Sequence, residues 1–329
     1  MAEALLEVNN LEVTFATRMG VVSPVRGVSF RVNTHETLGI IGESGCGKSV
    51  TAQALMGLLS SRTSRVEGEV ILGGRALHSL SAKVRRQRSG REMAMIFQDP
   101  LASLNPVMTI GAQIDESLRL HTSLNRALRQ QKTIGLLTQV GIADPARCAN
   151  AWPHELSGGM RQRVMIAMAI ATSPSLLIAD EPTTALDATI QAQILDLLDE
   201  LKQQTGMGIV IITHDLSVVA RLCQRVVVLY AGQVVEETDV HTLFEQPRHP
   251  YTRALLAARP SADHPSKTPL AEISGQVPSL HAFPAGCTYA DRCPLAQPRC
   301  RAQAPELQTV GYKAQLVRCW RAEETGAAG

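Results

Sequence analysis

A glycine-rich loop at residues 42–49 constrains the fold of this sequence more than any other feature. It matches the phosphate-loop pattern G-x-x-x-x-G-K-[S/T], and its residues are Gly42, Glu43, Ser44, Gly45, Cys46, Gly47, Lys48 and Ser49. The apolar run Thr37–Ile41 precedes the loop, and a helical pattern continues from it to Leu59. Strand, glycine loop and helix in this order open a nucleotide-binding α/β domain. This context favours a phosphate site over a chance glycine-rich turn.

The chemistry of the loop explains its residue types. Glycines allow backbone amides to converge on phosphate oxygens, and the helix that follows offers its N-terminal dipole to the same anion. Lys48 is expected to reach the β- and γ-phosphates of a nucleotide, and Ser49 to bind Mg²⁺. A nucleotide and Mg²⁺ are therefore the expected ligands of the loop.

A second pattern places two acids at the end of an apolar strand. The residues Leu176–Ala179 are apolar, and Asp180 and Glu181 follow them directly. A carboxylate at the C-terminal end of such a strand lies beside the phosphate loop in this class of fold. We expect Asp180 to hold Mg²⁺, directly or through water, and Glu181 to polarise the attacking water. Two surface acids are the alternative, which the apolar run disfavours.

The segment Leu156–Arg163 reads Leu-Ser-Gly-Gly-Met-Arg-Gln-Arg and narrows the class. It resembles the Leu-Ser-Gly-Gly-Gln signature of the ABC ATPase family. Met160 departs from that signature, but it is common in the family's peptide-importer branch. Ser157, Gly158 and Gly159 are expected to form a second anion cradle at a helix N-terminus. In the family this cradle caps the γ-phosphate of a nucleotide bound to the opposite subunit.

The resemblance extends to four further residues and implies a role for each. Phe15 matches the aromatic that stacks on adenine, with a core aromatic as the alternative. Gln98 matches the Q-loop glutamine, a ligand of Mg²⁺ and a catalytic residue. Asp187, in Ala-Leu-Asp, matches the D-loop. His214, in Thr-His-Asp, matches the switch histidine that contacts the γ-phosphate.

The expected fold class is α/β, with a core of the ABC ATPase type. This ATPase domain covers residues 1–258 and includes an antiparallel β subdomain and a helical insert at about 99–165. A loop is expected at Thr17–Pro24, between two strands. Residues 259–284 read as a linker rich in Pro, Ser, Ala and His. Residues 285–329 form a small cysteine-rich extension, too short to bury a core of its own.

Four of the seven cysteines, Cys287, Cys293, Cys300 and Cys319, lie in this extension, with 5, 6 and 18 residues between successive members. Four thiolates suit one [4Fe–4S] cluster, whose ligand spacings vary. The resemblance to the peptide-importer ATPases implies such a cluster, with these four cysteines as ligands. Zinc is an alternative, although no close cysteine pair is present. Four independent reduced thiols are the other.

Composition restricts the setting of the chain. The formal net charge is +2, which gives no sign of a nucleic-acid partner. No apolar run approaches the roughly 18–20 residues of a membrane-spanning helix, and the N-terminus lacks the pattern of a signal peptide. The polypeptide is therefore expected in the cytosol. Family resemblance implies peripheral attachment at the cytoplasmic face of the inner membrane.

The segment Pro247–Thr252, Pro-Arg-His-Pro-Tyr-Thr, is typical of oligopeptide and dipeptide importer ATPases and their nickel-uptake relatives. This resemblance implies an ATP-hydrolysing subunit that energises uptake of dipeptides or oligopeptides. Its implied partners are two transmembrane permease subunits, a second homologous ATPase subunit and an extracytoplasmic solute-binding protein. The loop Leu101–Pro106 lies where a permease would dock. A nickel-chelate importer remains open.

Two other classes of function compete with the importer. A soluble ABC ATPase acting on DNA or ribosomes would generally need a long coiled coil or a second cassette, and neither pattern occurs. A regulatory module without catalysis would need the loss of Lys48, Glu181 or His214, and all three are present.

Overall fold

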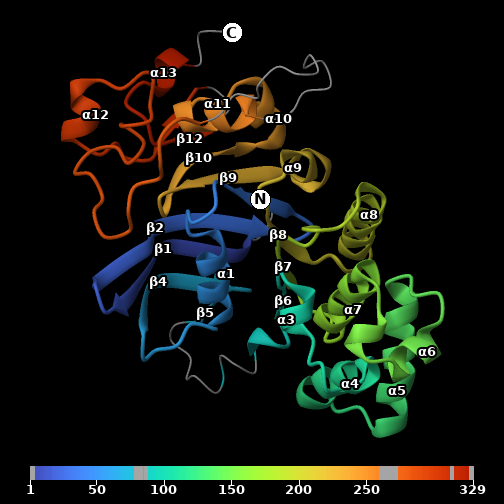
Figure 1. The fold of residues 1–329 in the computed structure, drawn as a ribbon. Coiled ribbons are helices and arrows are strands. Elements are labelled where there is room, and N and C mark those ends of the chain that lie inside the picture. Colours follow the sequence, from blue (N-terminus) through green and yellow to red (C-terminus); the bar gives the residue numbers. More distant parts are fainter. Residues whose placement is uncertain (1–3, 78–83, 85–87, 259–272, 312–314, 326–329) are drawn as a thin grey trace. The chain divides into compact units, whose positions relative to one another are not determined.

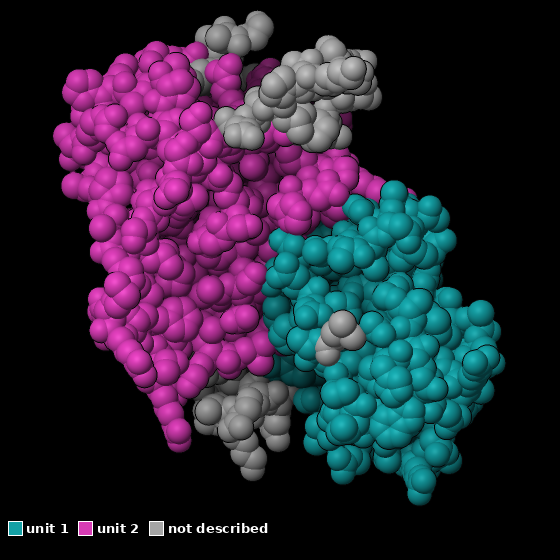
Figure 2. Space-filling view, viewed as in Figure 1, with its two compact units in different colours: residues 1–6, 31–37, 71–211 teal, residues 7–30, 38–70, 212–329 magenta. Residues whose placement is uncertain are grey.

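The computed structural model describes residues 4–77, 84, 88–258, 273–311 and 315–325. The chain forms two compact units, coloured separately in Figure 2. Unit 1 comprises residues 1–6, 31–37 and 71–211, and unit 2 comprises residues 7–30, 38–70 and 212–329. Of the expected linker, residues 259–272 lie outside the described residues. Within the described part, every helix is too short or too polar to cross a bilayer.

Unit 1 combines parallel strands with a group of helices. Strands β6 and β7 pair in parallel, with Ile96 opposite Ala179 near their C-terminal ends, and β8 lies next to β7. Helices α4–α7 fall between β6 and β7 in the chain and are green in Figure 1. The elements are β5 Arg75–Ala76, β6 Met93–Ile96, α3 Pro100–Ser103, α4 Ile110–His121, α5 Arg126–Gln139, α6 Pro145–Asn150, the 3₁₀ turn Pro153–Glu155, α7 Gly158–Ile170, β7 Leu176–Asp180, α8 Ala188–Thr205 and β8 Gly208–Ile212.

The helices of unit 1 form for identifiable local reasons. Helix α4 buries Ile110, Ile114 and Leu118, which recur every four residues and so share one face. The side chain of Asn125 caps α5 by accepting a hydrogen bond from a backbone N–H, and Asp144 does the same for α6. Such caps satisfy amides that a helix cannot bond internally.

Unit 2 holds a mixed sheet and most of a smaller one. The mixed sheet runs β11-β12-β10-β9-β3, in which β3 and β9 are parallel and the remaining pairs are antiparallel. Strands β2, β1 and β4 are neighbours in the smaller sheet. The elements are β1 Ala4–Thr17, β2 Gly20–Asn33, β3 Thr37–Ile41, α1 Lys48–Met56, β4 Ser64–Leu72, α9 Leu216–Leu222, β9 Arg225–Tyr230, β10 Gln233–Asp239, α10 Val240–Glu245, α11 Pro250–Ala257, α12 Pro298–Ala302, β11 Gln308–Val310, β12 Gln315–Val317 and α13 Ala322–Thr325.

The loop expected at Thr17–Pro24 is mostly strand. Strand β1 continues to Thr17 and β2 starts at Gly20, so only two residues form the turn. Pro24 lies inside β2, which is the outermost strand of its sheet. Proline is tolerated there because an outermost strand has N–H groups that need no partner strand.

The C-terminal segment gains stability by joining the sheet of unit 2. Strand β12 lies beside β10 (Figure 1), with Val317 opposite Glu236. Strand β11 pairs with β12. Val310, Val317 and Ala322 form a small buried cluster on which Cys319 packs. The segment is too small to bury a large core alone, and its pairing with β10 supplies the missing contacts. The α/β class with parallel and antiparallel strands is confirmed.

Candidate functional site

The phosphate loop of unit 2 follows the fully buried strand β3. Gly42 and Gly47 have positive φ values of 151° and 102°. A Cβ atom at Gly42 would lie 2.2 Å from the carbonyl oxygen of Leu229, and one at Gly47 would lie 2.3 Å from that of Pro24. Both positions therefore need glycine for conformation and for space. Ser44 and Gly45 are exposed at the tip of the loop.

Lys48 starts helix α1 and is buried, with 7% of its surface exposed. Its Nζ donates hydrogen bonds to the carbonyl oxygens of Gly42, at 2.7 Å, and Glu43, at 3.0 Å. The ammonium group is thus enclosed by the loop. Cys46 is 1% exposed, and burial raises the pKa of its thiol. Ser49 is half-buried in the first turn of α1.

Two other predicted residues belong to unit 2. His214 is exposed, and its neighbour Thr213 donates its N–H to the carbonyl oxygen of Ile40 at 3.2 Å. This bond ties the segment carrying His214 to β3, the strand that leads into the phosphate loop. Phe15 is half-buried near the end of β1.

Unit 1 brings Gln98 and Glu181 together. Gln98 follows β6 and Glu181 follows β7, so the parallel pairing of these strands places both at one end of the sheet. Gln98 Nε2 donates to Glu181 Oε2 at 3.1 Å, and Thr184 Oγ1 donates to the same oxygen at 2.8 Å. Asp180, 4% exposed, ends β7. Glu181 has φ of 48°, in the left-handed region.

The signature segment forms the start of helix α7. Ser157 caps this helix, and its hydroxyl accepts the N–H of Met160 at 3.4 Å. Ser157 and Gly158 are exposed. A Cβ at Gly159 would lie 3.0 Å from Ile190, so glycine permits close packing against the start of α8. Asp187 caps α8, accepting the N–H groups of Thr189 and Ile190.

The segment Pro247–Thr252 surrounds a buried carboxylate that the sequence analysis did not identify. Glu236 is fully buried in β10 and accepts the backbone N–H groups of Arg248, at 2.8 Å, and His249, at 2.9 Å. Gln315 of β12 donates to it at 2.6 Å. Burial raises the pKa of Glu236. The segment therefore has a structural role here. Its amino-acid sequence does not indicate that it binds the carboxylate of Glu236.

Two residues that contact the phosphate loop were also missed. The hydroxyl of Tyr251 accepts the backbone N–H of Glu43 at 2.8 Å. The guanidinium of Arg292 binds the carboxylate of Glu43. Tyr251 belongs to the sequence motif at residues 247–252, so that motif could have identified it as a functional residue. Arg292 lies beside Cys293, and no local sequence pattern marks it as a contact of the loop.

The four clustered cysteines line one apolar cavity of about 20 Å³, which has room for about one water molecule. All four are free thiols. Burial raises the pKa of Cys287 and Cys293, and that of Cys319 to about 11. In each of these thiols, burial disfavours the charged thiolate.

The predicted [4Fe–4S] cluster is wrong. Among the described residues, which include all four cysteines, no group of three or more His, Cys, Asp or Glu side chains is placed to hold a metal ion. The same finding gives no support to the zinc alternative.

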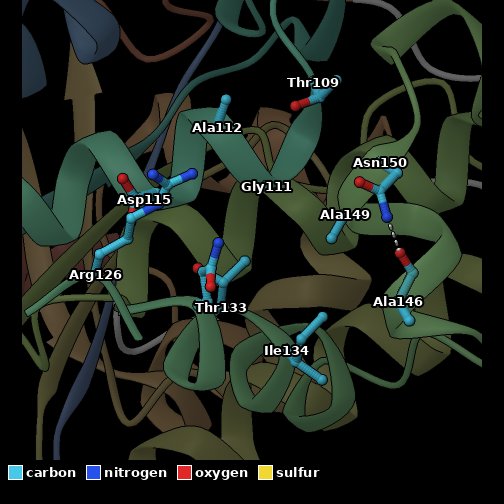
Figure 3. Close-up of a pocket in the computed structure, with 11 residues that line it drawn as sticks. Thr109, Gly111, Ala112, Asp115, Arg126, Thr133, Ile134, Ala146, Ala149 and Asn150 are labelled. Carbon is cyan, nitrogen blue, oxygen red and sulfur yellow. Dashed lines mark hydrogen bonds between the residues drawn. The ribbon is translucent and has the colours of Figure 1, made fainter. Parts of the chain in front are cut away.

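Unit 1 contains a larger pocket of about 500 Å³ among its helices (Figure 3). It is formed by α4, α5 and α6, and Asp115, Arg126 and Thr133 are among the residues that line it. Asp115 is paired with Arg129 at 2.7 Å. None of the residues that line it was predicted as a site residue.

Comparison with known proteins gives matches along the chain. The family profile "ABC transporter" matches residues 25–184, and the profile "Oligopeptide/dipeptide transporter, C-terminal region" matches residues 235–300. A probable peptide ABC transporter ATP-binding protein of Sinorhizobium fredii is 51% identical over 324 residues, covering 98% of this chain and 96% of the relative.

Two further relatives carry more specific names. The dipeptide transport ATP-binding protein of Escherichia coli is 51% identical, covering 92% of this chain and 93% of its own length. The protein of the same description from Bacillus subtilis is 44% identical, with coverages of 99% and 98%. Among solved structures, a dimeric ATP-binding cassette in a post-hydrolysis state with ADP and phosphate superposes with a TM-score of 0.64. It is 26% identical and covers 71% of this chain and 98% of its own.

Proposed function

This chain belongs to the ABC transporter ATP-binding proteins, which are ATPases, and from that premise we propose that it energises uptake of dipeptides and oligopeptides across the inner membrane. The substrate class is supported by relatives named for peptide and dipeptide transport that align along nearly the whole chain. The match to the C-terminal profile of these transporters, at residues 235–300, supports the same class.

The family binds ATP and Mg²⁺, and the residues present suit both. Lys48 and the loop amides would hold the phosphates, Ser49 and Asp180 would bind Mg²⁺ through oxygen atoms, and Phe15 would stack on adenine. Gln98 is a further candidate ligand of Mg²⁺. Hydroxyl and carboxylate oxygens are the ligands that Mg²⁺ prefers, which supports this assignment.

The carboxylate of Glu181 carries the proposal for catalysis. Gln98 and Thr184 both donate to its Oε2, so the carboxylate has a fixed orientation. In that orientation the carboxylate of Glu181 would accept a proton from an attacking water, as a general base must. His214 would contact the γ-phosphate.

Hydrolysis is proposed to occur in a pair of ATPase subunits. Ser157 and Gly158 are exposed at the N-terminus of α7, and with Gly159 they would form a second anion site on one chain. This site would bind the γ-phosphate of a nucleotide held by the partner, and Asp187 would lie at the same seam. The related cassette solved as a dimer with ADP and phosphate supports such a pairing.

The remaining partners are proposed from the family. Two transmembrane permease subunits would hold the ATPase pair at the cytoplasmic face of the inner membrane. Leu101–Pro106 would contact a permease, and a solute-binding protein would deliver peptide from outside. ATP would favour the closed pair because it supplies contacts that only the closed pair makes, and hydrolysis would release them.

Reconstitution tests this function. The chain is placed in vesicles with its permeases and partner ATPase, and ATP hydrolysis and uptake of a labelled dipeptide are measured with the solute-binding protein. Peptide should stimulate hydrolysis, and uptake should require ATP. Uptake of a nickel chelate without uptake of peptide would overturn the substrate class. If the rate of ATP hydrolysis is the same with and without the permeases, the transport role is wrong.

A further inference from the structure

The phosphate loop contains one acidic residue, Glu43, and its carboxylate is fully engaged by an arginine of the C-terminal segment. Arg292 Nη1 donates to Glu43 Oε2 at 2.7 Å, and Nη2 donates to Oε1 at 2.9 Å. This two-bond arrangement is the strongest form of an arginine–carboxylate pair. The side chain of Arg292 is only 4% exposed and that of Glu43 is 27% exposed, so salt screens this partly buried pair less than it screens a pair at the surface.

The guanidinium is held in place by three further acceptors. Arg292 donates to the carbonyl oxygens of Ser274, at 2.9 Å, and Ile273, at 3.0 Å, and to the hydroxyl of Tyr230 at 3.3 Å. The hydrogen bonds with Glu43 raise the pKa of Arg292 above its usual value, so the group is charged at any physiological pH. Its position therefore does not depend on the carboxylate alone.

Aromatic packing fixes the same region from a second side. Tyr230, Tyr251 and Tyr289 are all buried, and their ring centroids lie 4.6–5.4 Å apart. Tyr230 ends β9, Tyr251 lies in α11 and Tyr289 belongs to the cysteine-rich segment. The hydroxyl of Tyr251 accepts the N–H of Glu43, so this aromatic cluster holds the backbone of Glu43. Arg292 holds the side chain of the same residue.

An unpaired carboxylate in a phosphate loop opposes nucleotide binding, because it repels the polyphosphate at short range. We propose that Arg292 is a positioning residue for nucleotide binding, which neutralises Glu43 and thereby lets the C-terminal segment set the affinity of the chain for ATP. This inference rests on the proposed role of residues 42–49 as the phosphate site. It gives the segment a function that does not involve its cysteines.

The test measures binding of MgATP and MgADP to the full chain, together with kcat for hydrolysis. Arg292→Gln should raise the Kd for MgATP about tenfold, as one uncompensated charge near a polyphosphate predicts. The change in kcat should stay within about twofold, because the reacting groups are untouched. MgADP, which carries less charge, should lose less affinity than MgATP.

Two variants separate this electrostatic role from a structural one. The double variant Glu43→Gln/Arg292→Gln removes both charges and should restore most of the affinity for MgATP. Arg301→Gln breaks an exposed ion pair with Asp291 in the same segment and should leave the Kd unchanged. The defect of Arg292→Gln should also shrink as salt is raised, since salt screens the exposed charge.

The other outcomes distinguish a wrong role for Arg292 from a wrong assignment of the phosphate site. If Lys48→Ala abolishes MgATP binding but Arg292→Gln binds as the wild type does, the positioning role is wrong. If Lys48→Ala itself binds MgATP normally, the phosphate-loop assignment is wrong instead. If Arg292→Gln does not fold, Arg292→Lys replaces it. That variant keeps the charge without the two-bond geometry, so its Kd for MgATP should stay near the wild-type value. A tenfold rise in its Kd would mean that geometry and not charge matters, and would contradict the proposal.

Discussion

Single residues in unit 1 hold conformations that only their neighbours can maintain. Glu181 has a positive φ, which costs a residue other than glycine about 1–3 kcal/mol. Ala185, four residues later, has φ of 62° as well. Local strain at the end of β7 is thus maintained by the structure around it, a pattern that is frequent at sites of chemistry.

Glu181→Gln should leave MgATP binding intact and lower hydrolysis about 10²- to 10⁴-fold, the usual contribution of a positioned general base. The amide has the size of the carboxylate but accepts no proton. Thr184→Val removes one donor to Oε2 and should cause a smaller loss. Binding titration and phosphate release measure both effects. Hydrolysis by Glu181→Gln at the wild-type rate would mean that another residue activates water.

His249 makes stability depend on pH. It is buried at the start of α11, its Nδ1 accepts the N–H of Tyr251 at 3.1 Å, and burial beside Arg318 lowers its pKa from 6.5 to about 3. Because the folded pKa is depressed, the unfolded chain binds the proton first. The contribution of His249 to stability is therefore complete above pH 6.5 and is lost as pH falls toward 3.

His249→Asn should weaken this dependence, because asparagine can still cap α11 but does not titrate. Between pH 6.5 and 5, the fall in Tm should be smaller in His249→Asn than in the wild type. Glu236, whose pKa burial raises, opposes the trend in both proteins, so their difference isolates the histidine. Parallel Tm curves would show that His249 does not contribute. His241, an exposed histidine, gives the control variant His241→Asn.

At the scale of elements, the start of α7 is the feature whose role can be tested most directly. Ser157→Arg places a cation and a bulky chain at an exposed helix N-terminus. The chain's own loop at residues 42–49 should still bind MgATP, because the serine is proposed to serve the partner's nucleotide. The ATP-dependent pair should fail to form, which light scattering with MgATP measures. Loss of MgATP binding by the isolated chain would contradict action across the pair.

Patterns read from the sequence predicted the elements with strong local signals. Strand β3, helix α1 and strand β7 follow from apolar runs beside Gly42–Ser49 and Asp180. The sequence did not predict that β2 continues through Pro24, because proline usually interrupts a strand. Proline is tolerated here only because β2 is the outermost strand of its sheet. The pair Arg292–Glu43 joins residues 249 apart in sequence, and no local pattern encodes a contact of that range. The cluster prediction failed because the spacing of four cysteines does not show whether their side chains are placed to hold a metal ion.

At the scale of the whole molecule, the C-terminal segment is an integral part of unit 2. Deletion of residues 273–329 removes β11 and β12, and with them Gln315, which donates to the buried Glu236. The shortened chain should have a lower Tm and should self-associate at concentrations where the full chain does not. A chain that ends at residue 325 is the control. Size-exclusion chromatography with light scattering measures the state, and a monodisperse shortened chain of unchanged Tm would contradict this expectation.

The pairing of β12 with β10 also affects the tendency of the protein to aggregate at high concentration. An unpaired strand is a template on which other polypeptides can add strands, and natural proteins block such templates. Strand β10 contains Val234 and Val235, and Arg318 engages the carbonyl oxygens of both through its side chain and its backbone N–H. The new border of the sheet is β11, only three residues long. We therefore expect the cysteine-rich segment to prevent other polypeptides from pairing with β10. This protection would not require the thiols of the segment.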